Sequence, residues 1–225
     1  LIDRQEPLTE FRVGVNGHVR NNASWCWDSV DDGRVKKFYS GRSFDTKRQW
    51  RNKKGKNILV PMQNHDDLIT HGIDVYSWLL TLINDIKKHT DRPIVLRSNP
   101  FHAKSESSLI TSFQKKIYGI PGVEMVYSGR GIPTRSLEQD LEEAWCVVCH
   151  SSGVSVDAVI RGIPVICLGE QCMAWEVCGH DLSRIENPVT PDPVPWFEKM
   201  AMIQYSQEEF RSGECWNYVR PLLLD

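Results

Sequence analysis

The residues best suited to chemistry form a short polar loop, His150-Ser151-Ser152-Gly153. The apolar run from Trp145 to Cys149 precedes it and is typical of a fully buried strand. From Val154 to Ile160 the apolar residues recur at helical spacing, so the loop leads into a helix. Backbone N–H groups at a helix start, with two hydroxyls and a glycine beside them, favour binding of an anion such as phosphate. The competing interpretation is that Ser151 or Ser152 only caps the helix.

Five apolar runs, and the helical segments between them, must position this loop. We predict strands at 57–62, 93–97, 123–127, 145–149 and 164–168. Helices are predicted between them at 75–86, 107–118, 136–143 and 154–160. This alternation predicts an α/β fold, a Rossmann-like doubly wound parallel sheet.

Polar side chains lie at or beyond the ends of four of these strands. In open parallel sheets, ligands bind beyond the carboxyl ends of the strands, so we expect these side chains and the loop to converge on one crevice. Outside the loop they are Gln63, His65, Arg97, Asn99, His102 and Arg130.

Several common phosphate and hydrolase motifs are missing. The loop after the first strand has no Gly-x-Gly-x-x-Gly pattern, and the chain has neither a P-loop lysine motif nor a Gly-x-Ser-x-Gly elbow. A nucleotide-phosphate crevice therefore remains as the best interpretation, with its phosphate site between the fourth and fifth strands.

The run from His150 to Val165 resembles the nucleotide-sugar-binding segment of glycosyltransferases with the two-domain GT-B fold. It most resembles the branch related to capsule-polysaccharide and Kdo-type transferases and to phage-encoded homologues. The resemblance covers about residues 57–169 and implies a nucleotide-sugar donor, such as a UDP-sugar, with no further cofactor. It implies phosphate binding by Ser151, Ser152 and Gly153, and donor support by Asp157. Arg97-Ser98-Asn99-Pro100 is similar to the Arg-x-His-Pro of such domains, with Asn99 in place of the histidine.

Sugar transfer to a hydroxyl also needs a general base. His65 is our first candidate, because imidazole titrates near neutrality and the adjacent Asp66 can orient it. His102 is the second candidate. Helix N–H groups, hydroxyls and an arginine can stabilise the leaving group, so we expect no metal at this site.

A basic segment runs from Arg34 to Lys56, with ten lysines and arginines against one acid and with aromatic residues interleaved. Such a segment can neutralise phosphates and stack on bases, so if it contacts substrate a polyanion is implied. The resemblance to phage-encoded transferases then implies DNA carrying a hydroxylated base as the acceptor. The alternative is a solvated connecting loop whose aromatic side chains are buried. The candidate DNA-binding residues are Lys47, Arg48, Arg51, Lys53 and Lys54.

We divide the chain into an irregular basic segment at 1–56, the nucleotide-sugar-binding domain at 57–187, and a proline-rich linker with a helical tail at 188–225. In the tail, a helix is predicted at 196–205, and a capping box at Ser206 predicts another that stops at Gly213. The first segment is short for an acceptor domain. Either the acceptor half is minimal, or it is missing from this chain, or two chains join as a homodimer to complete one site.

Composition is that of an ordinary globular protein, with 225 residues, 40% hydrophobic, 25% charged and a net charge of −2. No apolar run approaches the roughly 20 residues of a membrane span, and we expect a cytoplasmic protein, in the host cytoplasm if it is phage-encoded. The seven cysteines are expected to be reduced.

Two cysteine patterns have the letters of cofactor sites. Cys146-Val-Val-Cys149-His150 matches a c-type haem pattern, but its cysteines would face opposite sides of a strand. Cys172 and Cys178 lack a second pair with zinc-ligand spacing, so no metal site is expected. A nucleotide-sugar epimerase, a capsule-type saccharide transferase and a non-catalytic nucleotide- or DNA-binding module remain as alternative functions.

Overall fold

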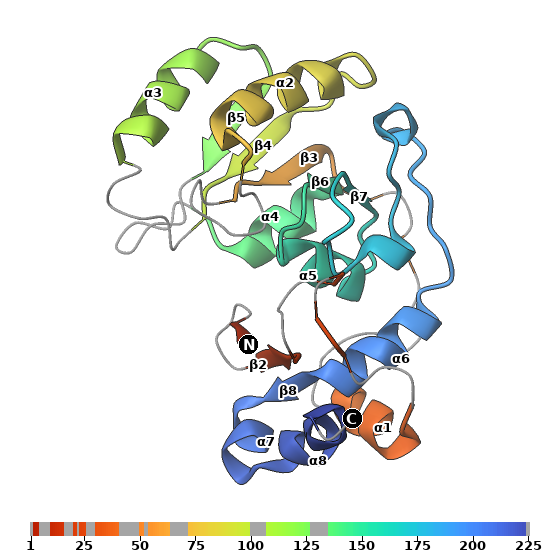
Figure 1. The fold of residues 1–225 in the computed structure, drawn as a ribbon. Helices are drawn as coiled ribbons and strands as arrows, with labels where there is room; N and C mark the ends of the chain where they lie inside the picture. The colour runs from red at the N-terminus through yellow and green to blue at the C-terminus, as the bar shows by residue number, and fades with distance from the viewer. Residues whose placement is uncertain are drawn as a thin grey trace. The chain divides into compact units, whose positions relative to one another are not determined.

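The computed structural model describes residues 2–4, 10–15, 20–21, 23–25, 30–40, 50–51, 54–63, 72–99, 107–126 and 135–223 (Figure 1). The chain forms two compact units, Leu1–Gln49 with Pro191–Asp225, and Trp50–Thr190. The predicted domains at 1–56, 57–187 and 188–225 stay a prediction. Across the described residues, no helix combines the length and the apolar character that crossing a bilayer requires.

The larger unit is built on a five-stranded sheet in which every pairing is parallel. Its strands are β3 (Asn57–Pro61), β4 (Ile94–Arg97), β5 (Val123–Val126), β6 (Ala144–Cys149) and β7 (Val165–Cys167). The order β5-β4-β3-β6-β7 confirms the predicted α/β doubly wound sheet. The chain builds outward from β3 in one direction and then returns to place β6 on its other side. The carboxyl ends of β3 and β6 therefore form the topological switch point, where such sheets bind ligands.

Helices cover both faces of this sheet (Figure 1). The helices α2 (Val75–Lys87) and α3 (Ser107–Ile117) lie on one face, and α4 (Leu137–Glu143) and α5 (Val154–Ile160) on the other. Asp74 caps α2 by accepting the amides of Tyr76 and Ser77. One stripe of α2 is buried against the sheet: Val75, Leu79, Leu82, Ile83 and Ile86. Short 3₁₀ helices follow the sheet at Trp175–Val177 and Leu182–Arg184.

Strand β6 contains a register shift that redirects its side chains. Asn57 pairs with Ala144 and Ile58 with Cys146, so Trp145 is the additional residue of a β-bulge. The Trp145 indole N–H donates to the carbonyl of Ile185 at 2.8 Å. Beyond the bulge, Cys146 packs in the apolar core that α2 and α3 cover, whereas Cys149 contacts sulfur atoms on the opposite face.

Hydrogen bonds from Arg51 hold the segment before β3 against the end of α4. The guanidinium of Arg51 donates to the carbonyls of Glu142, at 3.0 Å, and of Ala144. Its backbone N–H donates to the carbonyl of Gly162 at 2.6 Å. Gly55 has φ 88°, and a Cβ there would collide with the Ala144 carbonyl, so only glycine fits.

The smaller unit joins residues from both ends of the chain. An antiparallel sheet in the order β1-β2-β8 comprises Ile2–Arg4, Glu10–Val13 and Gln204–Ser206. Its helices are α1 (Asp32–Ser40), α6 (Val194–Ile203), α7 (Gln207–Ser212) and α8 (Glu214–Val219), followed by a 3₁₀ turn at Arg220–Leu223.

The helix predicted at 196–205 ends at Ile203, because the next residues pair with β2 instead. The capping box at Ser206 and the helix end at Gly213 are confirmed. Sequence reasoning missed α1.

A buried ion pair connects α1 to the tail in this smaller unit. Arg34 donates to the carboxylate of Glu209 and to the carbonyl of Gln204, and its guanidinium lies 4.5 Å from the centre of the Tyr205 ring. Lys37 Nζ lies 3.2 Å from Glu209 as well. Two of the first cations of the basic segment, Arg34 and Lys37, are therefore paired with carboxylates of the same protein, the first of them buried.

Candidate functional site at the carboxyl edge of the sheet

A buried glutamine connects the end of β3 to the loop after β6 at the switch point. Gln63 follows β3, and its side-chain carbonyl accepts the backbone N–H of Ser151 at 3.1 Å. Its amide Nε2 donates to Ser151 Oγ at 3.1 Å. Gln63 and Ser151 are both buried. Ser151 therefore uses its amide and hydroxyl inside the protein, and its role here is to position the loop.

The next two residues of the loop, Ser152 and Gly153, differ from Ser151 in their backbone N–H donors. Ser152 Oγ accepts the N–H of Val154 at 3.3 Å, and the Ser152 carbonyl accepts the hydroxyl of Ser155 at 2.7 Å. Gly153 occupies the N-cap position of α5 and offers no side chain to cap it. Within the described parts of the chain, the backbone N–H groups of Ser152 and Gly153 donate to no other group. We name Gln63, Ser151, Ser152 and Gly153 the switch-point cluster.

His150 lies beside this cluster and is half-buried. Its Nδ1 lies 3.3 Å from Ser151 Oγ, and its ring meets the edge of Trp78 at 5.8 Å between centroids. Burial lowers the pKa of His150, and the nearby Cys172 opposes this only in part, so the imidazole is neutral at pH 7. A Cβ on Gly169 would overlap the ring, so the absence of a side chain there makes room for it.

A second cluster lies beyond β4. Arg97 Nη1 donates to the carboxylate of Asp140 at 2.5 Å and to the carbonyl of Arg135 at 3.1 Å. Arg135 Nε donates to the other Asp140 oxygen at 2.5 Å, and the Asp140 side chain is fully buried. We name Arg97, Arg135 and Asp140 the arginine cluster. The described contacts of Arg97 run to α4 rather than to the His150–Gly153 loop, and its role as a phosphate ligand stays a prediction.

Sequence reasoning missed Asp140 and Arg135. Asp140 belongs to an acid-rich helix, where a carboxylate is ordinarily solvated. The available signal was its position next to the buried Leu141, on the inward side of α4.

Other predicted site residues are placed as follows. Asp157 lies in the first turn of α5, with its carboxylate 3.6 Å from Arg161, and donor support by Asp157 stays a prediction. Asn99 is partly buried just beyond β4. Arg51 caps α4 as described above, and Lys54 is exposed. The remaining predicted residues lie outside the described residues: Lys47, Arg48, Lys53, His65, Asp66, His102 and Arg130. The general base and most of the DNA-binding residues therefore stay predictions.

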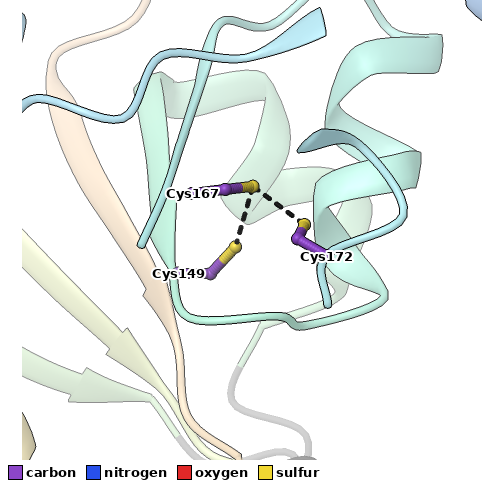
Figure 2. A group of neighbouring side chains, drawn as sticks. All are labelled: Cys149, Cys167 and Cys172. Carbon is purple, nitrogen blue, oxygen red and sulfur yellow. Dashed lines mark hydrogen bonds between the residues drawn. The ribbon is translucent and has the colours of Figure 1, made fainter. Parts of the chain in front are cut away.

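Three thiols come together next to the switch-point cluster (Figure 2). Cys149 Sγ lies 3.8 Å from Cys167 Sγ, which lies 2.8 Å from Cys172 Sγ. Burial acts to raise the pKa of the Cys172 thiol, yet hydrogen bonds from the other two thiols and from the Ser155 hydroxyl bring it well below its usual value. The sequence prediction of no metal considered Cys172 only with Cys178, and it missed this grouping because the three residues converge only once β6 and β7 pair.

Comparison with known proteins agrees with the capsule-polysaccharide part of the predicted resemblance, and the relation to phage-encoded homologues stays a prediction. Residues 17–192 match the family described as "Capsule polysaccharide biosynthesis protein". By sequence, none of the curated proteins matches the chain. Among solved structures, a Thermosulfurimonas dismutans protein, KpsC, a beta Kdo 2,7 transferase, is similar at 15% identity and a TM-score of 0.47, over 93% of this chain and 74% of that one.

A second similar structure is the Methanocaldococcus jannaschii UDP-GlcNAc 2-epimerase, at 14% identity and a TM-score of 0.41, over 75% of this chain and 47% of that one. At these identities and TM-scores, neither similarity assigns an activity or a substrate. The family match covers most of the sequence and includes the whole parallel sheet. The chain therefore belongs to the capsule polysaccharide biosynthesis protein family.

Proposed function

We propose that the chain is a glycosyltransferase that transfers a sugar from a nucleotide-sugar donor to a hydroxyl group of a saccharide acceptor. One observation carries the proposal: Gln63 holds the loop after β6 at the switch point and leaves the amides of Ser152 and Gly153 open. Membership of a capsule polysaccharide family supports sugar chemistry. The donor phosphates would lie against these amides, at the sheet edge where nucleotides bind in such folds.

The residues of the cluster would act mainly on the leaving group. Cleavage of the bond between sugar and phosphate develops negative charge on the phosphate oxygens, and fixed N–H groups stabilise that charge without having to reorganise. Gln63 contributes by holding Ser151, which fixes the direction of the next two amides. His150 is neutral and therefore adds no positive charge. The base that accepts the proton of the acceptor hydroxyl is proposed to be His65, oriented by Asp66.

The acceptor is proposed to be a saccharide rather than DNA. Within the basic segment, Arg34, Lys37 and Arg51 all contact carboxylate or carbonyl groups of this protein. These contacts favour the connecting-loop interpretation for this part of the segment. Gel-shift measurements against salt test the alternative: binding that weakens as ionic strength rises, and that is lost after charge reversal at Lys53 and Lys54, would support a DNA acceptor.

Donor binding is the first test. Thermal unfolding with a panel of nucleoside mono- and diphosphate sugars should show a rise in Tm for at least one donor, because a ligand that binds only the folded state stabilises it. Ser152→Ala keeps the open amide but removes the hydroxyl that is predicted to donate to the phosphate, so it should weaken binding of that donor about tenfold, as for a lost hydrogen bond to a charged group. Ser112→Ala, on the exposed side of α3, is the matched control and should bind normally.

Transfer is the second test. The stabilising donor should be consumed only in the presence of a saccharide acceptor. Conversion of the donor alone would identify an epimerase, and binding without turnover under any acceptor would identify a non-catalytic module. A panel in which no nucleotide sugar raises the Tm would contradict the proposal.

A further inference from the structure

Three cysteines from three different segments direct their sulfur atoms to one point (Figure 2). Cys149 is the last residue of β6 and Cys167 the last residue of β7, and the parallel register places the two directly opposite each other. Cys172 arrives from the loop that follows β7. The three sulfur atoms all lie within 4.8 Å of one another.

The site is closed to solvent. Cys149, Cys167 and Cys172 have no exposed surface, and neither has Ser155, whose hydroxyl oxygen lies 3.2 Å from Cys172 Sγ. Cys146 provides the contrast on the same strand: it is equally buried, but it packs among apolar side chains on the other face of the sheet. Cys146 is therefore buried as a small apolar residue, with no hydrogen bond to another thiol among the described residues, whereas the sulfur atoms of the other three lie together.

We propose that Cys149, Cys167 and Cys172 bind one soft metal ion, Zn²⁺ or Cu⁺, in a structural site. Thiolate ligands select these ions over hard cations such as Mg²⁺ and Ca²⁺. Zinc–sulfur bonds of about 2.3 Å in a tetrahedral arrangement place sulfur atoms about 3.8 Å apart. Tetrahedral Zn²⁺ would take the hydroxyl oxygen of Ser155, which lies 3.2 Å from Cys172 Sγ, as its fourth ligand, whereas Cu⁺ needs only the three sulfur atoms. The separation of Cys149 and Cys167 is 3.8 Å, so these two already have the required spacing.

Cys172 would have to move outward by about 1 Å to reach the same spacing. Its loop can accommodate this, because Cys172 is held by turn hydrogen bonds to Gly169 and Trp175 rather than by a strand. The hydrogen bonds that Cys172 now receives from neighbouring thiols and Ser155 would be replaced by the bond to the metal. Each thiol that becomes a ligand releases one proton to solvent, so metal affinity rises with pH.

A metal at this position would fix the two loops at the switch point. Cys149 immediately precedes His150, and Cys172 lies in the loop that also contains Gly169, whose N–H donates to the His150 carbonyl at 3.0 Å. The ion would therefore connect the ends of β6 and β7 next to the switch-point cluster. It would stabilise that geometry without taking part in chemistry itself.

The test uses the full chain, purified under reducing conditions, stripped of metal and then supplied with Zn²⁺ or Cu⁺ in separate samples. Elemental analysis after desalting should find one bound ion per chain for at least one of the two metals, and that metal should raise the Tm. Cys149→Ser, Cys167→Ser and Cys172→Ser should each weaken binding more than tenfold. Cys146→Ser is the matched control and should retain binding.

Three outcomes would overturn the proposal. They are no bound ion in the unmodified chain, equal loss of binding in Cys146→Ser, or a metal-free chain two hydrogens lower in mass in which peptide mapping finds a disulfide between Cys167 and Cys172. If the serine variants fail to fold, Co²⁺ bound to the unmodified chain decides the question. The intensity of its thiolate-to-metal absorption should correspond to three sulfur ligands, and a cobalt spectrum without thiolate bands would also overturn the proposal.

Discussion

The carboxyl edge of the parallel sheet carries two polar clusters that differ in what they leave unpaired. In the arginine cluster, both Asp140 oxygens accept from arginine, which offsets part of the positive charge, and Arg135 Nη2 is buried without a hydrogen-bond partner among the described residues. In the switch-point cluster, Gln63 satisfies Ser151 completely but leaves the amides of Ser152 and Gly153 open. The two clusters lie at the ends of strands in the same sheet, and among the described residues only the switch-point cluster leaves backbone N–H donors open beside a loop.

The difference shows that a polar residue at the ligand-binding edge need not bind ligand. A buried charge must be compensated, and an internal partner achieves this as well as a phosphate would. Arg97, which has the residue type and strand position of a phosphate ligand, is occupied by Asp140. Two backbone amides with no distinctive side chain are the better candidates. We therefore expect substitutions in the arginine cluster to alter stability first, and those in the switch-point cluster to alter donor binding first.

The largest effect is expected for Asp140→Asn. This change leaves two partly buried arginines without their negative partner, and removing one member of a buried ion pair destabilises by about 3–5 kcal/mol. Urea unfolding monitored by tryptophan fluorescence measures the change. Glu143→Gln on the same helix is the control, because the Glu143 side chain is 42% exposed and lies 3.8 Å from Arg135, and it should lose less than about 1 kcal/mol. Equal losses for the two variants would remove the distinction between a closed cluster and a surface pair.

For Gln63→Ala we expect a smaller loss of stability than for Asp140→Asn, together with a larger loss of donor affinity. The buried amide and hydroxyl of Ser151 lose their partner, which destabilises the fold by about 1–3 kcal/mol. Because the loop is then no longer held, donor affinity should fall at least tenfold, measured by calorimetry on the folded variant. Gln114→Ala, on α3 and partly exposed, should change neither quantity. Normal donor binding by Gln63→Ala would show that the loop needs no support from β3.

The smallest effect on stability is expected for Arg97→Lys. Lysine keeps the positive charge beside Asp140 but loses the guanidinium geometry, so unfolding should become easier by about 1 kcal/mol. Donor affinity should stay within threefold of the original, since the described contacts of Arg97 end at α4. A tenfold or larger loss of affinity with unchanged stability would instead restore Arg97 as a phosphate ligand, and it would make the two clusters parts of one site.

The strands of the larger unit could be predicted because their signals are local. Each is a short apolar run bounded by polar or turn residues, and the alternation with helices implies a parallel sheet before any strand order is known. The pairing of Gln63 with Ser151 required the strand order as well. The sequence between residues 63 and 151 does not indicate that β6 pairs with β3. Sequence analysis could therefore place Gln63 and Ser151 at the same edge of the sheet, but it could not predict that they are in contact.

The elements that were mispredicted depend on partners far along the chain. Gln204 and Tyr205 continue the helical pattern of α6 but pair with β2, which lies almost 200 residues earlier in the sequence. Helix α1 was missed because Arg34, which reads as a surface cation, is buried against Glu209. In each instance a distant contact overrides the local preference.

The attachment of Arg51 limits how far this protein can be shortened. Helix α4 has no basic residue in its last turn, and Arg51 supplies from outside the positive charge and the donors that its terminal carbonyls need. A version trimmed to begin at β3 would keep every strand of the parallel sheet but would leave that helix end uncapped, and α4 carries Asp140. Recombinant fragments of the larger unit should therefore begin at or before Trp50.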